Sequence, residues 1–182
     1  NNNVNQKNLI FIFNICNILK INLKNIIPTL NKFKGLRFRN EIVINGKKIK
    51  VINDSKSTSF SSTQELIDTN KKTFWILGGL PKKGDKFTLS KKDCFNLRAY
   101  IFGKNAEFFV KRLKDKVHYQ KFDDMISAIK KIKIDFKKEQ MSNEKIILFS
   151  PASASFDDFK NSEDRGKYFN YQLKKIRING KK

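Results

Sequence analysis

The sequence predicts an α/β protein with a Rossmann-like, mainly parallel sheet, helices on both faces of that sheet, and two helices ahead of it. From residue 41 onward, apolar strand-like runs alternate with helical patterns, and this alternation implies right-handed crossovers between parallel strands. Of the 182 residues, 39% are hydrophobic and 17 are Phe, enough to build a core. A wholly disordered chain is therefore excluded.

The chain begins with two predicted helices. Apolar residues recur at helical spacing over residues 4–19, which predicts an amphipathic helix. A shorter helix is predicted over residues 23–33, with Pro28 as a bend or restart. The pattern changes at Gly35, so we expect a boundary there that separates residues 1–34 from residues 35–182.

A hairpin opens the second part. The β-branched runs 41–44 and 47–52 are joined by Asn45-Gly46, a strong hairpin signal. An overlapping capping-box pattern in residues 61–65 then predicts the start of a helix. The remaining strands are predicted at 73–77, 98–102 and 144–149, and the remaining helices after Gly103 to about 113, at 122–138 and at 162–176.

The net charge of +22 raises the question of a nucleic-acid partner. Of the 39 basic residues, 33 are Lys, whereas base and phosphate recognition favours the Arg fork. The lysines are scattered in pairs rather than in long runs, so codon bias explains the charge better than a nucleic-acid partner does. A basic binding module for nucleotide or nucleic acid stays the alternative.

Other site classes have little support. With two Cys and one His, a Cys/His zinc site is excluded, and no metal site is predicted within the chain. No apolar run reaches the length of a membrane span, and residues 1–8 lack the features of a signal peptide. We therefore expect a cytoplasmic protein without a membrane partner.

Three polar loops follow predicted strands and point to a binding site. They are residues 53–58, 78–84 and 150–157, rich in hydroxyls, glycine and lysine. In an open α/β sheet, ligands bind beyond the carboxyl ends of the strands, where such loops converge. Each loop alone suits a cap or a turn, but three together favour a binding site.

These loops resemble the Mur ligase family. The resemblance rests on NDSKST at 53–58, on Gly78-Gly79 with Lys82, and on the segment from Ser150 through Arg165-Gly166. Residues 35–41 also resemble the GLxHRxE segment of the family, and Asn5 and Asn8 fall where its HNxxN motif would lie. The resemblance covers nearly the whole chain.

The resemblance implies an ATP-dependent amide ligase of peptidoglycan precursor synthesis. Residues 1–34 would be the tail of a central ATPase domain, and residues 35–182 the C-terminal domain. The motifs look most like those of the family member that adds D-glutamate. In that reaction ATP phosphorylates the carboxylate of UDP-N-acetylmuramoyl-L-alanine, and the amine of D-glutamate attacks the acyl phosphate. A sister ligase that adds another amino acid stays an alternative.

The resemblance also implies roles for individual residues. Those expected at the nucleotide are Asn5, Asn8, Arg39 and Asp54, with Lys56 as the catalytic residue near the phosphates. Those expected to hold D-glutamate are Thr58, Lys82, Ser155 and Phe156. The phosphate-binding loop, the Mg²⁺ ligands and the UDP-sugar domain would lie upstream, so we expect the 182-residue chain alone to be an inactive fragment.

Overall fold

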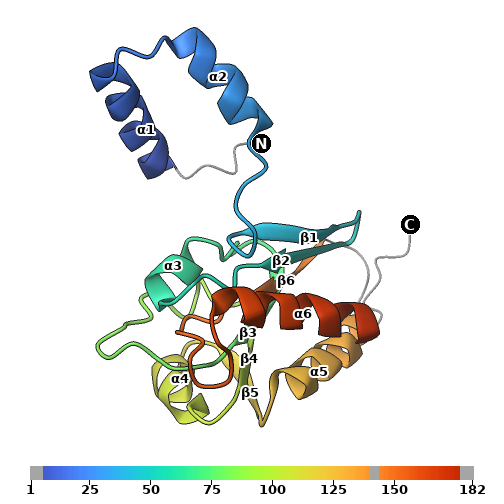
Figure 1. Cartoon of the computed structure of the whole chain (residues 1–182). Helices are drawn as coiled ribbons and strands as arrows, with labels where there is room; N and C mark the ends of the chain where they lie inside the picture. Colours follow the sequence, from blue (N-terminus) through green and yellow to red (C-terminus); the bar gives the residue numbers. More distant parts are fainter. Residues whose placement is uncertain (1–5, 140–143, 177–182) are drawn as a thin grey trace. The chain divides into compact units, whose positions relative to one another are not determined.

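The computed structural model describes residues 6–139 and 144–176 and divides into two units, Asn1–Arg37 and Phe38–Lys182 (Figure 1). The first unit contains helices α1 (Gln6–Ile18) and α2 (Leu23–Lys32). The side chain of Asn22 caps α2 by accepting a hydrogen bond from the Lys24 amide. The assignment of the two units to two different ligase domains stays a prediction.

The first unit carries large apolar side chains on its surface. Ile10, Phe11 and Ile18 of α1 are each more than three-fifths exposed. Within the described residues, no helix combines the length and the apolar character that crossing a membrane would need.

The second unit is built on a six-stranded sheet with the order β1-β2-β6-β3-β4-β5. The strands are β1 (Glu41–Asn45), β2 (Ile49–Asn53), β3 (Lys72–Leu77), β4 (Leu97–Phe102), β5 (His118–Phe122) and β6 (Lys145–Phe149). Among the described strands, β1 and β2 pair antiparallel in the predicted hairpin, but Asn45 pairs with Lys50, so the turn lies at Lys47-Lys48 rather than at Asn45-Gly46. Every other pairing among these strands is parallel. The prediction of a mainly parallel sheet is confirmed.

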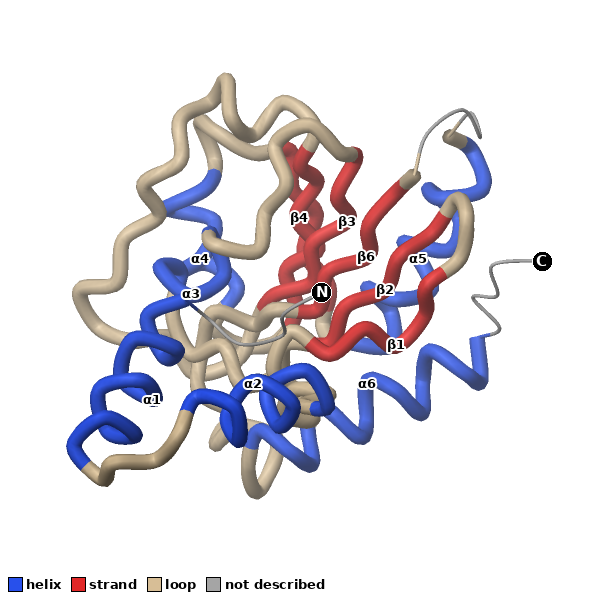
Figure 2. Tube along the Cα trace, turned by 90° about the horizontal axis from the view of Figure 1, so that it is seen from above, coloured by secondary structure: helices blue, strands red, loops and turns tan. Residues whose placement is uncertain are grey.

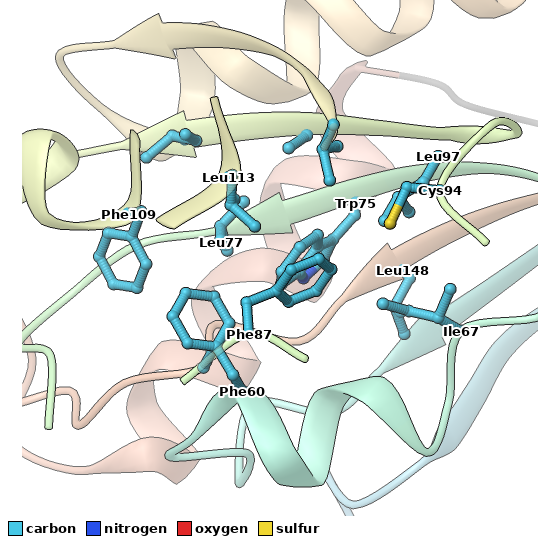
Figure 3. Close-up of a cluster of buried hydrophobic side chains, with 14 of the residues drawn as sticks. Phe60, Ile67, Trp75, Leu77, Phe87, Cys94, Leu97, Phe109, Leu113 and Leu148 are labelled. Atoms are coloured by element: carbon cyan, nitrogen blue, oxygen red, sulfur yellow. The ribbon is translucent and has the colours of Figure 1, made fainter. Parts of the chain in front are cut away.

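Helices cover both faces of this sheet because its strands alternate their side chains. Trp75 of β3 faces a core shared with α3 (Phe60–Gln64) and α4 (Ala106–Leu113), shown in Figure 3. Phe74, its neighbour, faces the core shared with α5 (Met125–Lys138) and α6 (Ser162–Ile176). Figure 2 shows the two helix pairs on opposite sides of the strands. Strands buried on both faces read as continuous apolar runs, as these do.

Three details differ from the sequence prediction here. Strand β5 was not predicted, and α5 begins at Met125 rather than at 122, because Asp124 caps the helix. The capping box expected in residues 61–65 is wrong, since Ser59 caps α3 by accepting from the Ser62 amide. The side-chain Oε1 of Gln64 instead accepts from the Thr88 amide.

Candidate functional site

The carboxyl ends of β2, β6 and β3 lie at one edge of the sheet, since these strands run parallel. Three loops leave the sheet there: the first loop (53–58), the second loop (78–84) and the third loop (150–157). Each begins where its strand ends. The sequence prediction that these loops share one edge is confirmed by the pairing of the strands.

Main-chain hydrogen bonds join the loops to one another. The Asp54 amide of the first loop donates to the Phe149 carbonyl at 2.7 Å, at the start of the third loop. Leu80 of the second loop and Ala154 of the third exchange two hydrogen bonds, at 3.0 and 2.9 Å. These bonds hold loops that are distant in sequence next to one another.

Gly79 is required where the second and third loops meet. A Cβ atom built there would lie 2.5 Å from Ser153 Oγ and 2.7 Å from the Ala154 carbonyl oxygen. The backbone φ of +129° also lies in the region that side chains disfavour. Only glycine allows this close approach.

Arg165, in the first turns of α6, clamps the first loop to the third. Its guanidinium is buried and donates to the Ser55 carbonyl at 2.7 Å, the Ser153 carbonyl at 2.9 Å and the Ala154 carbonyl at 3.0 Å. Burial lowers the pKa of this guanidinium to about 10, and the nearby Asp157 carboxylate opposes the shift. Arg165 therefore stays charged at neutral pH and holds two site loops through their main chains.

Asp54 lies at the end of β2 with its carboxylate almost fully buried. One oxygen accepts from the Asn40 amide at 2.9 Å and the other from the Ser150 hydroxyl at 2.9 Å. Burial raises the pKa of Asp54 above its ordinary value, and these two hydrogen bonds and the charge of Arg39 oppose that rise. The carboxylate thus joins the first loop to the segment before β1 and to the third loop.

Several hydroxyls of the motifs are used inside the protein. The Ser150 hydroxyl, which donates to Asp54, also lies 2.8 Å from the Thr63 hydroxyl. The Thr63 hydroxyl in turn lies 2.8 Å from the Ser57 hydroxyl. Ser57 also contacts Ser62 at 2.8 Å. A buried chain of hydroxyls therefore connects the carboxylate to α3, and these groups hold the loops in place.

Other predicted site residues lie on the surface around this core. Arg39, Thr58 and Lys82 are exposed, and the side chain of Phe156 is 72% exposed. Lys82 lies two residues after Leu80 and Phe156 two residues after Ala154, so both flank the paired segment of the second and third loops. Of the predicted site residues other than Lys56, these exposed ones offer one arginine, one lysine, one hydroxyl and one aromatic ring.

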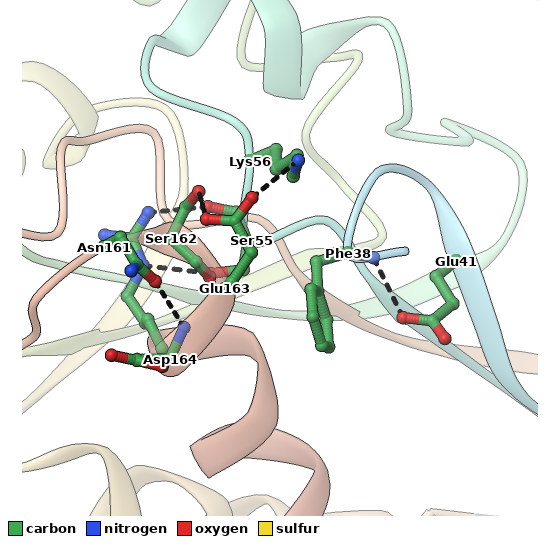
Figure 4. A network of polar contacts seen from close by, with 9 residues as sticks. Phe38, Glu41, Ser55, Lys56, Asn161, Ser162, Glu163 and Asp164 are labelled. Atoms are coloured by element: carbon green, nitrogen blue, oxygen red, sulfur yellow. Dashed lines mark hydrogen bonds and ion pairs between the residues drawn. The ribbon is translucent and has the colours of Figure 1, made fainter. Parts of the chain in front are cut away.

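Lys56 is partly exposed and forms an ion pair with Glu163 of α6, at 2.8 Å (Figure 4). The hydrogen bond from Lys56 lowers the pKa of Glu163 to about 2, assisted by bonds from its own amide and from Ser162. The carboxylate is therefore ionised at any pH near neutrality.

The remaining predicted residues are buried, lie in the other unit or fall outside the described residues. Ser155 is buried, and its carbonyl accepts from the Phe159 amide at 2.9 Å. Asn8 is exposed on α1, in the other unit, and Asn5 lies outside the described residues. Within residues 6–139 and 144–176, no group of three or more His, Cys, Asp or Glu side chains could hold a metal ion.

Sequence reasoning did not assign two residues of the site. Arg165 lies in the motif segment, but nothing in the sequence indicates that it is buried against carbonyl groups of residues 55, 153 and 154. Glu163 is one of several acidic residues near the start of α6, and only the structure shows which of them meets Lys56.

Comparisons with known proteins agree with the motifs. Over 174 residues, 95% of its length, the chain is 33% identical to a UDP-N-acetylmuramoylalanine–D-glutamate ligase of Wolbachia sp. subsp. Brugia malayi, of which it covers 34%. The corresponding enzyme of Francisella philomiragia is 33% identical over 169 residues, which are 91% of this chain and 40% of that one. No family model matches the chain.

A solved structure supports the fold. The pseudomurein peptide ligase type C of Methanothermus fervidus superposes with a TM-score of 0.53 at 16% identity, covering 88% of this chain and 33% of that one. The chain thus spans about a third of the length of the Wolbachia ligase and about a third of the length of the Methanothermus ligase. The resemblance to Mur ligases that the motifs predicted is confirmed.

Proposed function

We propose that this chain, whose curated relatives are UDP-N-acetylmuramoylalanine–D-glutamate ligases, is the C-terminal portion of such a Mur ligase. The whole ligase would use ATP to join D-glutamate to UDP-N-acetylmuramoyl-L-alanine through an acyl phosphate, in the cytoplasm. Residues 35–182 would supply one wall of the active site, and residues 1–34 would belong to the preceding domain.

One observation carries the proposal: the three motif loops meet at one edge of the sheet and are hydrogen-bonded to one another. This is where open α/β sheets bind ligands. A rigid platform of this kind would hold Lys56, Thr58 and Lys82 in constant positions, as a binding wall requires.

The nucleotide would meet the first loop. Arg39 and Lys56 offer positive charge to phosphate oxygens. Each Asp54 oxygen has one protein donor, and a carboxylate has about four acceptor positions, so capacity remains for ribose hydroxyls. Asn5 and Asn8 would approach the nucleotide from the preceding domain.

D-Glutamate would meet the second and third loops. The exposed ammonium of Lys82 suits a short charge-assisted bond to one of its carboxylates. Thr58, Ser155 and the Phe156 main chain would supply the neutral hydrogen bonds. The pairing of Leu80 with Ala154 fixes the spacing of these groups.

The chain by itself would not catalyse the reaction. Aligning the γ-phosphate and neutralising its charge normally need a phosphate-binding loop and Mg²⁺. The described residues offer no metal-binding group, so we expect the Mg²⁺ ligands in the rest of the ligase and derive no step through the ion here.

A chimeric enzyme tests this function. Residues 1–182 would replace the matching C-terminal third of the Wolbachia ligase, and phosphate release from ATP would be measured with both substrates. We expect D-glutamate-dependent turnover by the chimera and none by the 182-residue chain. In the chimera, Lys82→Ala should raise the KM for D-glutamate by roughly 10- to 150-fold, with a smaller effect on the KM for ATP.

Lys83→Ala is the matched control, because this neighbouring lysine is also exposed. It should leave the KM for D-glutamate unchanged. Turnover with another amino acid in place of D-glutamate would favour a sister ligase. An inactive chimera whose 182-residue part binds nucleic acid with a steep salt dependence would favour the basic binding module instead.

A further inference from the structure

The Lys56–Glu163 ion pair joins the residue expected at the phosphates to an acidic residue of α6. The ammonium lies 2.8 Å from one carboxylate oxygen. The other oxygen of Glu163 accepts from the Ser162 hydroxyl at 3.1 Å. The side chains are 27% and 44% exposed, so both groups can be reached from solvent.

The main chain on both sides of Glu163 is hydrogen-bonded where it approaches the first loop. The Ser55 hydroxyl donates to the Ser162 carbonyl at 2.8 Å, which ties the residue before Glu163 to the residue before Lys56. Asn161 accepts from the Asp164 amide at 2.8 Å and fixes the first turn of α6 (Figure 4). The two partners therefore leave adjacent, tethered main-chain segments, and the ion pair closes a small ring of contacts.

Glu163 also keeps its negative charge. Its pKa is lowered to about 2, chiefly by the hydrogen bond from Lys56. Near neutral pH, the Lys56 ammonium thus already has an anionic oxygen in front of it, in the manner of a phosphate oxygen at a lysine.

We propose that Glu163 is a built-in counterion that occupies the anion position of Lys56 and that an incoming phosphoryl group must displace. The idea rests on the proposed function in taking phosphate as the anion that Lys56 meets. Glu163 would then weaken the binding of phosphate to Lys56 and would leave this lysine with a partner when no phosphate is bound. It acts through Lys56 and contacts no reacting atom.

The reactivity of Lys56 tests this competition in the purified 182-residue chain. Lysine amines are acetylated with a trace of N-hydroxysuccinimide acetate, and the peptide containing Lys56 is quantified by mass spectrometry during a titration with inorganic pyrophosphate. We expect pyrophosphate to protect Lys56, and Glu163→Gln to lower the midpoint of protection by about 2- to 5-fold, the scale of a partly exposed ion pair.

Glu144→Gln is the matched control. Glu144 pairs with Lys71 at the opposite edge of the sheet, with 30% and 40% exposure. The substitution makes the same change in net charge, so it should leave the Lys56 midpoint unchanged. A shift as large as that of Glu163→Gln would mean that net charge, not the local pair, controls the site, and would overturn the proposal.

Two further results would also overturn it. An unchanged or raised midpoint in Glu163→Gln would show that Glu163 does not compete, and a complete lack of protection in both proteins would show that Lys56 binds no phosphate. The proposed function is judged separately by repeating the titration with ADP. Protection by pyrophosphate but not by ADP would argue against a nucleotide site and leave the counterion role in place.

Discussion

Polar groups at the carboxyl ends of the strands (the carboxyl edge) differ in burial from those at the amino ends (the amino edge). At the carboxyl edge, Arg165 and Asp54 are buried and bonded to main-chain groups and hydroxyls. At the amino edge, Arg98 and Glu139 form an ion pair at 2.9 Å with 40% and 27% of their side chains exposed, and Lys71 pairs with Glu144. The sheet thus carries a buried hydrogen-bond network at its carboxyl edge and solvent-screened ion pairs at its amino edge.

This difference in burial determines how much stability each kind of contact contributes. A buried donor that satisfies several carbonyls cannot be removed without leaving unpaired acceptors, whereas an exposed ion pair returns to water when it is broken. The proposed ligands would bind at the carboxyl edge, where the contacts between the loops already constrain the sequence.

The largest expected effect comes from replacing the buried arginine. Arg165→Met should destabilise the chain by about 3 kcal/mol or more, because the carbonyls of Ser55, Ser153 and Ala154 would lose their donor. Arg98→Met, the same change at the amino edge, should cost less than about 1 kcal/mol. Urea unfolding of both variants measures the contrast. Equal losses would mean that the two edges do not differ.

A pair of glycines gives the next effect. Gly79→Ala should cost roughly 2–4 kcal/mol, because the added methyl would collide with Ser153 and Ala154. Gly84→Ala has a positive φ but no atom within 4 Å, so only backbone strain of about 1 kcal/mol applies. Thermal unfolding of the two variants compares them. A Gly84→Ala loss that matched Gly79→Ala would show that strain, not the close approach of the loops, dominates.

The pH dependence of stability should differ in sign between two buried aspartates. Burial raises the pKa of Asp54, so its contribution to stability is greatest at low pH and is lost as pH rises through the raised pKa. Burial acts in the same direction on Asp135, but hydrogen bonds from Lys131 and Tyr100 outweigh it, and its pKa is lowered. The contribution of Asp135 is therefore present above its unfolded pKa and lost as pH falls through the lowered one.

Asparagine substitutions measured by urea unfolding from pH 3 to pH 7 separate the two. Relative to the parent protein, Asp135→Asn should become more destabilising as pH rises, whereas Asp54→Asn should become less so. Parallel curves for the two variants would show that the surroundings of the two carboxylates are equivalent.

The smallest effect is expected at the exposed pair of the amino edge. Lys71→Met should change stability the least of these substitutions, because its ion pair with Glu144 is exposed and solvent-screened. The loss should vanish in high salt. A larger loss that resists salt would show that this edge also depends on specific contacts.

Strand β5 shows which part of the fold the sequence could not predict. The buried strands are apolar runs and were predicted, as was the β1–β2 hairpin, although its turn lies two residues later than the Asn45-Gly46 signal indicates. In contrast, β5 reads His-Tyr-Gln-Lys-Phe, and its first four residues are exposed at the edge of the sheet. A strand that pairs on one side and faces water has neither the apolar run nor the alternation that periodicity detects.

The sequence predicts where the site lies, but it does not predict which side chains face a ligand and which hold the loops together. Loops after parallel strands could be placed at one edge from chain order alone. The hydroxyls of Ser57 and Ser150 looked like ligand donors, yet the structure uses them to hold the loops. The partners of Arg165 lie as many as 110 residues away, a separation at which local sequence patterns carry no information. The ligand roles of Arg39, Asp54, Lys56 and Lys82 stay predictions.

The position of β6 in the sheet also matters for how the chain is made. β6 lies between β2 and β3 but is synthesised after the other five described strands, about 70 residues after β3. At roughly 5–20 residues per second, a ribosome leaves the facing edges of β2 and β3 unpaired for several seconds. Unpaired strand edges recruit other strands, so the nascent chain is most exposed to aggregation in that interval. Chaperone demand during translation should therefore fall sharply once Phe149 has left the exit tunnel.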